Sequence, residues 1–217
     1  MTILKQIQKR VGVTADGVWG PVTAAAIWHA LPDGDELDKQ AFYAAVRKIT
    51  GSLDQVQVDS IEAILNRTAY LPIQQIAYIL ATAWHEARFT PQREWGRGKG
   101  HTYAKKGKHG QSQYGRGLVQ LTWDRNYEWA DKRIGLKGAL LKDFDLALRP
   151  DIAADVLVYG MLEGAFASNG KPLDHYQKGD TFDYLHARQT VNRMDKAALI
   201  AGLAREFETA LRAGGLS

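Results

Sequence analysis

The sequence predicts a mainly α-helical protein that consists of a small N-terminal unit and one larger domain. Apolar residues recur at helical spacing through most of residues 39–87 and 123–212. Strand patterns are few, and at most one short hairpin is expected near residues 91–121. The polar, turn-rich segment PDGDELD at residues 32–38 is typical of a linker. The length of 217 residues suits one domain with a small appendage.

The composition restricts the chemistry that the chain can perform. Hydrophobic residues make up 45% and charged residues 24%, as in a folded globular protein. The chain has no cysteine, which excludes disulfides, thiolate metal sites and a cysteine nucleophile. The net charge of +4 indicates attraction to an anionic partner. Nucleic acid, anionic lipid and bacterial cell wall all fit this charge.

Residues 1–31 are expected to form two short helices around a turn. The first helix is indicated by the helical spacing of Ile3, Leu4, Ile7 and Val11. The turn has the pairs Asp16-Gly17 and Gly20-Pro21, and the second helix is VTAAAIWHAL. From these residues alone, a simple helical hairpin is one interpretation.

The segment VGVTADGVWGP also resembles the repeat of peptidoglycan-binding domains. The residues that match are Asp16, Gly17, Gly20, Pro21 and Thr23. The match covers about the last half of such a domain, and the usual first helix is missing. The resemblance implies a truncated wall-binding module at residues 1–31, with Asp16, Gly17, Trp19 and Gly20 as its candidate binding residues.

The larger domain, residues 39–217, is predicted to be built from helices. The expected helices lie at 39–50, 55–68, 72–87, 123–132, 150–166, 181–191 and 195–212. From residue 90 to 114 the chain is rich in Gly, Lys and Arg and has no apolar period. A loop of this length inside a compact domain is usually functional.

Two motifs that suggest a cofactor fail on inspection. The stretch WHEARF at 84–89 contains half of a zinc-protease motif, but Phe89 stands where the second histidine is needed. The stretch GRGKG at 96–100 is followed by His101 and Thr102, which do not complete a phosphate loop. We therefore expect neither a metal nor another cofactor.

Glu86 is the first candidate for a catalytic acid. On a helix it shares a face of mixed polarity with Gln75, Ile79 and Thr82, which suits a cleft wall or a solvated surface. A cleft that excludes water would favour the protonated form of this acid. The alternative is a surface glutamate paired with Arg88 or a lysine.

Glu94, at the start of the glycine-rich loop, supplies a second carboxyl group. Glycoside hydrolysis usually needs two such groups on either side of the scissile bond. The sequence does not give their separation, so inverting and retaining mechanisms stay open.

The stretch YGRGLVQLTWDRNY at 114–127 resembles the signature of family 19 glycoside hydrolases, the chitinases, and of endolysins that share their fold. The matching residues are Tyr114, Gly115, Arg116, Gly117, Gln120, Leu121, Thr122, Asn126 and Tyr127. The resemblance covers roughly residues 40–212. It implies a lysozyme-like helical domain. The missing disulfides and the shorter loop before the signature bring the chain closer to phage endolysins than to plant chitinases.

The resemblance also assigns roles to individual residues. It implies Glu86 as general acid, Glu94 as second acid and Thr122 as the residue that holds the attacking water. It places Gln120 and Asn126 in the sugar cleft, together with Asn192, the one residue carried over from a C-terminal family stretch.

Aromatic and polar side chains in the same region suit a sugar. Rings that could stack on a sugar are supplied by Trp95, Tyr103, Tyr114 and Trp123. Gly115 and Gly117 permit a close backbone approach. Tyr114, Arg116 and Trp123 are candidate substrate-binding residues, and Arg116 is also expected to act structurally or electrostatically near the acids.

The sequence as a whole predicts an endolysin that hydrolyses β-1,4 bonds of peptidoglycan as a muramidase. A chitinase and a non-catalytic wall-binding protein are the alternatives, and no motif supports nucleic-acid binding. The N-terminus MTILKQIQKR has no signal-peptide core, and no apolar stretch is long enough to span a bilayer. We therefore expect synthesis in the host bacterial cytoplasm, release through a holin and no stable membrane insertion. The oligomeric state is open, with a monomer as the expectation.

Overall fold

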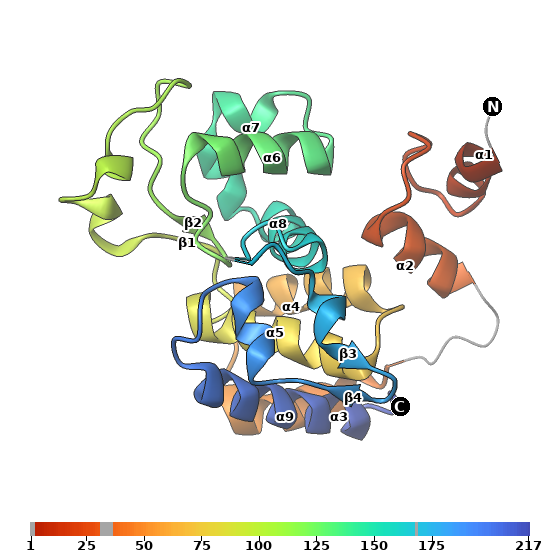
Figure 1. The fold of residues 1–217 in the computed structure, drawn as a ribbon. Coiled ribbons are helices and arrows are strands. Elements are labelled where there is room, and N and C mark those ends of the chain that lie inside the picture. Colours follow the sequence, from red (N-terminus) through yellow and green to blue (C-terminus); the bar gives the residue numbers. More distant parts are fainter. Residues whose placement is uncertain (1–2, 31–36, 168) are drawn as a thin grey trace.

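The computed structural model describes residues 3–30, 37–167 and 169–217 (Figure 1). The predicted mainly helical class, consistent with a lysozyme-like helical fold, is confirmed. The α-helices are α1 (Ile3–Arg10), α2 (Pro21–Ala30), α3 (Lys39–Thr50), α4 (Gln55–Thr68), α5 (Ile73–Ala87), α6 (Asp124–Ile134), α7 (Ala139–Lys142), α8 (Pro150–Glu163) and α9 (Ala197–Ala213). The 3₁₀ helices are η1 (Trp95–Gly98), η2 (Thr102–Ala104), η3 (Phe144–Leu148), η4 (Leu173–Tyr176) and η5 (His186–Thr190).

Two short antiparallel hairpins are the only paired strands among the described residues. In the first, β1 (Gln92–Arg93) pairs with β2 (Arg116–Gly117), which confirms the hairpin expected near 91–121. In the second, β3 (Gln177–Lys178) pairs with β4 (Thr181–Phe182). The helix expected at 181–191 is therefore wrong. This stretch forms β4 and η5, because Thr181 and Phe182 pair with the preceding strand and only 186–190 keeps a helical turn.

Helix α5 is the centre of the larger domain. It packs against α9 on one side and against α4 and α8 on the other (Figure 1). Gln75, Ile79 and Thr82 are at most 1% exposed. The expectation that this face forms a cleft wall or a solvated surface is therefore wrong along most of the helix. Only its last turn reaches the surface, because neighbouring helices cover α5 on both sides.

Local signals in the sequence explain where the helices begin and end. Asp38 caps α3 and Asp54 caps α4, where Gln57 completes a capping box. Gln57 also donates a hydrogen bond to the carbonyl oxygen of Arg88, the left-handed residue that ends α5. The start of α4 therefore holds the backbone directly after the last turn of α5.

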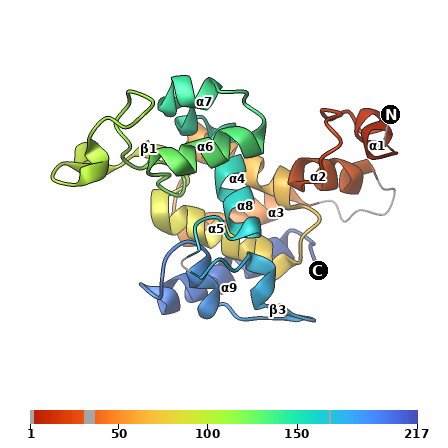
Figure 2. The same ribbon diagram turned by 45° about the horizontal axis from the view of Figure 1, so that its top comes forward.

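The N-terminal helices and the loop between β1 and β2 lie on opposite sides of the helical body (Figure 2). The predicted linker at 32–38 lies outside the described residues except for Leu37 and Asp38, so the division into a module and a domain stays a prediction. None of the described helices is long and apolar enough to cross a membrane.

Candidate active site

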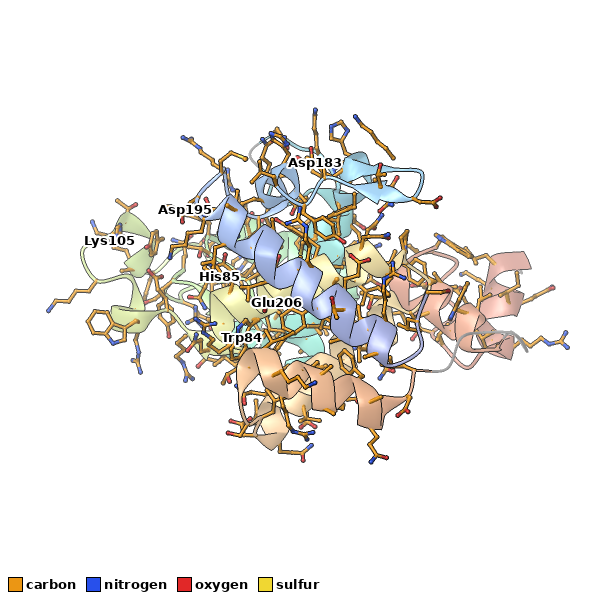
Figure 3. All side chains as sticks on the ribbon, turned by 90° about the horizontal axis from the view of Figure 1, so that it is seen from below. Trp84, His85, Lys105, Asp183, Asp195 and Glu206 are labelled. Atoms are coloured by element: carbon orange, nitrogen blue, oxygen red, sulfur yellow. The ribbon has the colours of Figure 1, made fainter. Side chains whose placement is uncertain are left out.

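Glu86 lies in the last turn of α5, where the central helix meets the surface. Its side chain is 21% exposed, and its Oε1 is 2.8 Å from Nη1 of Arg188. The two groups form an ion pair that lacks the angular geometry of a hydrogen bond. The expected alternative partner, Arg88, instead places its guanidinium over the ring of Trp84. Figure 3 labels Trp84 and His85, which mark this end of α5.

Arg188 was not predicted from the sequence as a site residue. Its side chain is 2% exposed, and its Nε donates a hydrogen bond to the carbonyl oxygen of Asp195. Arg188 is a single arginine in a stretch predicted to be helical, and nothing in the local sequence indicates that its side chain contacts Glu86. Asn192, which was predicted, is exposed and lies one turn further on, with its N–H bonded to the carbonyl of Arg188.

His85 lies beside the acid and is partly buried. Burial lowers the pKa of His85, and the nearby cation of Arg188 acts in the same direction while Glu86 opposes both. His85 is therefore neutral near pH 7.

Glu94 follows β1, and three hydrogen bonds fix it. Its backbone N–H donates to the carbonyl of Gly115 at 2.7 Å, which extends the β1–β2 ladder by one residue. Its Oε1 accepts a bond from the hydroxyl of Tyr103 at 2.8 Å, and its Oε2 accepts from the N–H of Gly115 at 3.0 Å. Both side-chain bonds suit an ionised carboxylate, which accepts only. This is the state that a catalytic base needs.

Tyr103 connects Glu94 to the signature stretch. Its pKa is raised by burial and by the hydrogen bond to Glu94, so it keeps its proton as a donor. Its ring meets that of Trp123 edge to face at 5.5 Å. Gly98 allows this arrangement, because a Cβ there would lie 2.5 Å from Cε2 of Tyr103. Tyr103 was expected as a sugar platform, and the structure gives it a further partner in Glu94.

The predicted polar residues of the signature lie together. Thr122 donates its hydroxyl to the carbonyl of Gln120 at 2.7 Å, and Asn126 donates to the carbonyl of Thr122 at 2.7 Å. The residues that line an adjacent cavity of about 450 Å³ are Val119, Gln120, Leu121, Thr122, Arg125, Asn126, Ala165, Phe166, Ala167 and Val191. Val191 precedes Asn192, so the C-terminal stretch also reaches this cavity. Glu86 and Glu94 do not line it.

Strained backbone is concentrated near these residues. Seven described non-glycine residues have positive φ, and five of them lie between 88 and 123: Arg88, Phe89, Arg97, Gln120 and Trp123. Such conformations cost about 1–3 kcal/mol each and cluster at functional sites. They occur two and three residues after Glu86, three residues after Glu94 and on both sides of Thr122. The strain marks the same segments that the motifs indicated.

Tyr114 and Arg116 were predicted to bind substrate, but both are buried. Tyr114 is 7% exposed, and the guanidinium of Arg116 lies 3.7 Å from the centroid of its ring. Arg116 also bonds the carboxylate of Asp145 at 2.7 Å and the hydroxyl of Tyr127 at 3.0 Å. These contacts favour a structural role for both, which agrees with the structural role also considered for Arg116.

The glycines of the signature do allow a close approach. A Cβ on Gly115 would lie 2.8 Å from Oε1 of Gln120, and one on Gly117 would lie 2.8 Å from the carbonyl oxygen of Ala147. Trp123, by contrast with Tyr114, is 38% exposed and presents a ring to solvent.

The candidate wall-binding residues form a compact turn at the N-terminal unit. Gln8, which was not predicted, is 1% exposed and donates to Asp16, while its oxygen accepts from the N–H of Gly17. Trp19 is 61% exposed, whereas Gly20 is buried, with its Cα facing the side chain of Tyr159. Trp19 is therefore the residue of this group that offers a large apolar surface to a ligand, and Asp16 is exposed beside it.

The arrangement can support acid and base chemistry. One carboxyl group is mostly covered and lies beside a buried cation, and a second is held as a hydrogen-bond acceptor at the start of the loop. The hydroxyl of Thr122 and the amide of Gln120 lie on the turn that follows β2, and the amide of Asn126 lies in the first turn of α6. Paired carboxyl groups with nearby amides and hydroxyls are what hydrolysis of a glycosidic bond requires.

No protein-family model matches the chain, and no curated protein matches it in sequence. Among solved structures, the chain is similar to a crystal structure of a mutant of chitinase C. The TM-score is 0.42 with 16% sequence identity, and the similarity covers 91% of this chain and 95% of that one. Similarity at this level carries no argument about fold or activity, which depend on the residues described above.

Proposed function

We propose that this chain is a glycoside hydrolase that cleaves β-1,4 bonds in the glycan strands of bacterial peptidoglycan, as an endolysin of the muramidase type. The proposal depends on the observation that two carboxyl groups are held by different kinds of partner. Glu86 is paired with the buried Arg188, and Glu94 accepts bonds from Tyr103 and Gly115. Glu94 is held as an acceptor, as a base requires, whereas Glu86 has a cation beside it and must take up a proton before it can act as the donor.

In the proposed reaction Glu86 donates a proton to the leaving glycosidic oxygen. Arg188 fixes the position of this carboxyl group and counters the negative charge that remains after the proton has left. Glu94 takes a proton from the attacking water. The hydroxyl of Thr122 donates a hydrogen bond to the carbonyl of Gln120. The lone pairs of its oxygen therefore remain available to accept a hydrogen bond from that water.

The substrate assignment depends on the N-terminal unit. Its turn resembles that of peptidoglycan binders, and Trp19 stands exposed on it. An aromatic ring beside polar groups is suited to stacking on a sugar. The endolysin assignment rests on this resemblance together with that of residues 114–127, and synthesis in the bacterial cytoplasm with release to the wall through a holin belongs to the proposal.

Digestion of purified peptidoglycan and of chitin tests the proposal. The new reducing ends are identified by mass spectrometry, and we expect N-acetylmuramic acid ends from peptidoglycan. Cleavage of chitin alone would contradict the endolysin assignment. Tight wall binding without cleavage of either polymer would instead identify a non-catalytic wall-binding protein.

A further inference from the structure

The loop between the two strands of the first hairpin is strongly cationic. No Asp or Glu occurs between Trp95 and Trp123. We call residues 95–111 the cationic lobe. Its exposed cations Arg97, Lys99, Lys105 and Lys106 have no ionic or hydrogen-bonding side-chain partner in the part of the chain that the structure describes. The lobe stands out from the helical body in both views (Figures 1 and 2).

Two further cations of this region are neutralised within the protein. Lys108 contacts the carboxylate of Glu128, which also contacts His109, and Arg116 pairs with Asp145. Four like charges without a counter-ion repel one another and stabilise nothing in the fold. Their arrangement is explained if an anionic ligand supplies the missing charges.

The lobe is tied to the second carboxyl group. Arg97 donates its backbone N–H to the carbonyl of Glu94 at 2.9 Å, and Tyr103 bonds the carboxylate of Glu94. The N–H of Lys108 bonds Asp124 on the signature side. The cationic lobe is therefore tied by hydrogen bonds to Glu94 at one end and to Asp124 of the signature stretch at the other.

We infer that the cationic lobe binds carboxylates carried by the substrate, namely those of the peptides attached to the glycan strand. This inference rests on the proposed function and makes it specific for a charged glycan. Chitin is neutral and gains nothing from the lobe. Trp95 lies on the cationic lobe and is 97% exposed, so its ring is available to stack on a sugar. This contact does not distinguish a charged glycan from a neutral one. Trp95 is the only large apolar side chain exposed on the lobe, which does not suit insertion into a membrane.

The test compares two quadruple variants of the full chain. The lobe variant is R97Q/K99Q/K105Q/K106Q. The control variant R47Q/K48Q/K137Q/K178Q removes the same charges from exposed positions outside the lobe. The substrates are native peptidoglycan and peptidoglycan whose carboxylates have been amidated.

Exposed ion pairs are weak and sensitive to salt, so we expect kcat/KM of the lobe variant on native peptidoglycan to fall about tenfold at low ionic strength, mainly through KM. The rate of the wild type should fall with added salt, and that of the lobe variant should not. On amidated peptidoglycan the wild type, the lobe variant and the control variant should agree within about twofold. Equal activity of the lobe and control variants on native peptidoglycan would overturn the inference.

Cosedimentation with both forms of peptidoglycan separates this inference from the proposed function. Binding that depends on the lobe and on substrate carboxylates, but without cleavage by the wild type, would support the lobe and contradict the hydrolase. Binding that is the same for native and amidated wall would overturn the role of the lobe. Binding to phosphatidylglycerol vesicles is measured for the wild type and the lobe variant as well. If the lobe variant loses vesicle binding that the wild type shows but still binds the wall, the partner of the lobe is a membrane and the inference is overturned.

Discussion

Replacing Glu86 by glutamine removes the proposed proton donor and the carboxyl group that faces Arg188. General acid catalysis contributes about 10²- to 10⁴-fold, so we expect the rate of peptidoglycan hydrolysis to fall by that factor. The structure predicts a loss of stability as well, because the guanidinium of Arg188 is 2% exposed and would lose its charged partner.

The size of the stability loss follows from the burial of the two groups. Removing one partner of a fully buried ion pair costs about 3–5 kcal/mol. Glu86 is 21% exposed, and glutamine keeps an oxygen that can face Arg188. We therefore expect a decrease of about 1–2 kcal/mol in the free energy of unfolding, which lowers Tm by about 2–8 °C in a domain of this size.

A double-mutant cycle isolates the pair. The free energy of unfolding in urea is measured for the wild type, E86Q, R188M and the double variant. The double variant should be more stable than the sum of the single effects predicts, by about 1–2 kcal/mol. The control is E206Q, which removes the charge of an exposed glutamate of α9 that Figure 3 labels and should combine additively with R188M. Additivity within about 0.5 kcal/mol would refute the ion pair, and full activity of E86Q would remove Glu86 from the mechanism.

Two further changes probe the surroundings of the acids. Gly98 and Gly96 both have positive φ, so alanine strains either by about 1–2 kcal/mol, but only at Gly98 does it collide with Tyr103 and disturb Glu94. We expect G98A to lower kcat/KM at least about tenfold more than G96A, and equal rates for the two variants would argue against a role of Tyr103 in holding Glu94. Burial lowers the pKa of His85, so below about pH 6.5 the unfolded chain takes up this proton more readily than the folded protein. The free energy of unfolding should therefore fall as the pH drops below this value, and H85Q should flatten that part of the profile measured by urea denaturation; an unchanged slope would contradict the assignment.

Helix positions were predictable where capping and apolar spacing agree. The helices expected at 39–50 and 55–68 were found with those bounds, because Asp38 and Asp54 mark their starts. The stretch 181–191 failed, since strand pairing across a tight turn is a contact between segments that helical periodicity does not register. The buried mixed face of α5 failed for a related reason. Gln75 donates to the side chain of Asp174, far along the chain, and Thr82 donates back to the carbonyl of Tyr78 in its own helix, so both polar groups are satisfied although they are buried.

The structure brings three motif residues of the candidate site together, but no local pattern indicated the partners of the acids. Gln120, Thr122 and Asn126 are joined by hydrogen bonds, with Asn126 in the first turn of α6. Arg188 contacts Glu86 across 102 positions of sequence, and no local pattern indicates such a contact. Tyr114 was expected to stack on a sugar, but its ring is buried beneath the guanidinium of Arg116. The sequence does not show whether an aromatic residue in a motif is exposed or covered.

Digestion of peptidoglycan in water enriched in oxygen-18 tests the central claim most directly. If Glu86 donates the proton and Glu94 with Thr122 delivers water, each new N-acetylmuramic acid reducing end carries one oxygen-18 atom, and E86Q and E94Q release almost none. Mass spectrometry of the released fragments gives this result without a model substrate. Products that lack oxygen-18 at the new end, or undiminished release by both variants, would contradict the account.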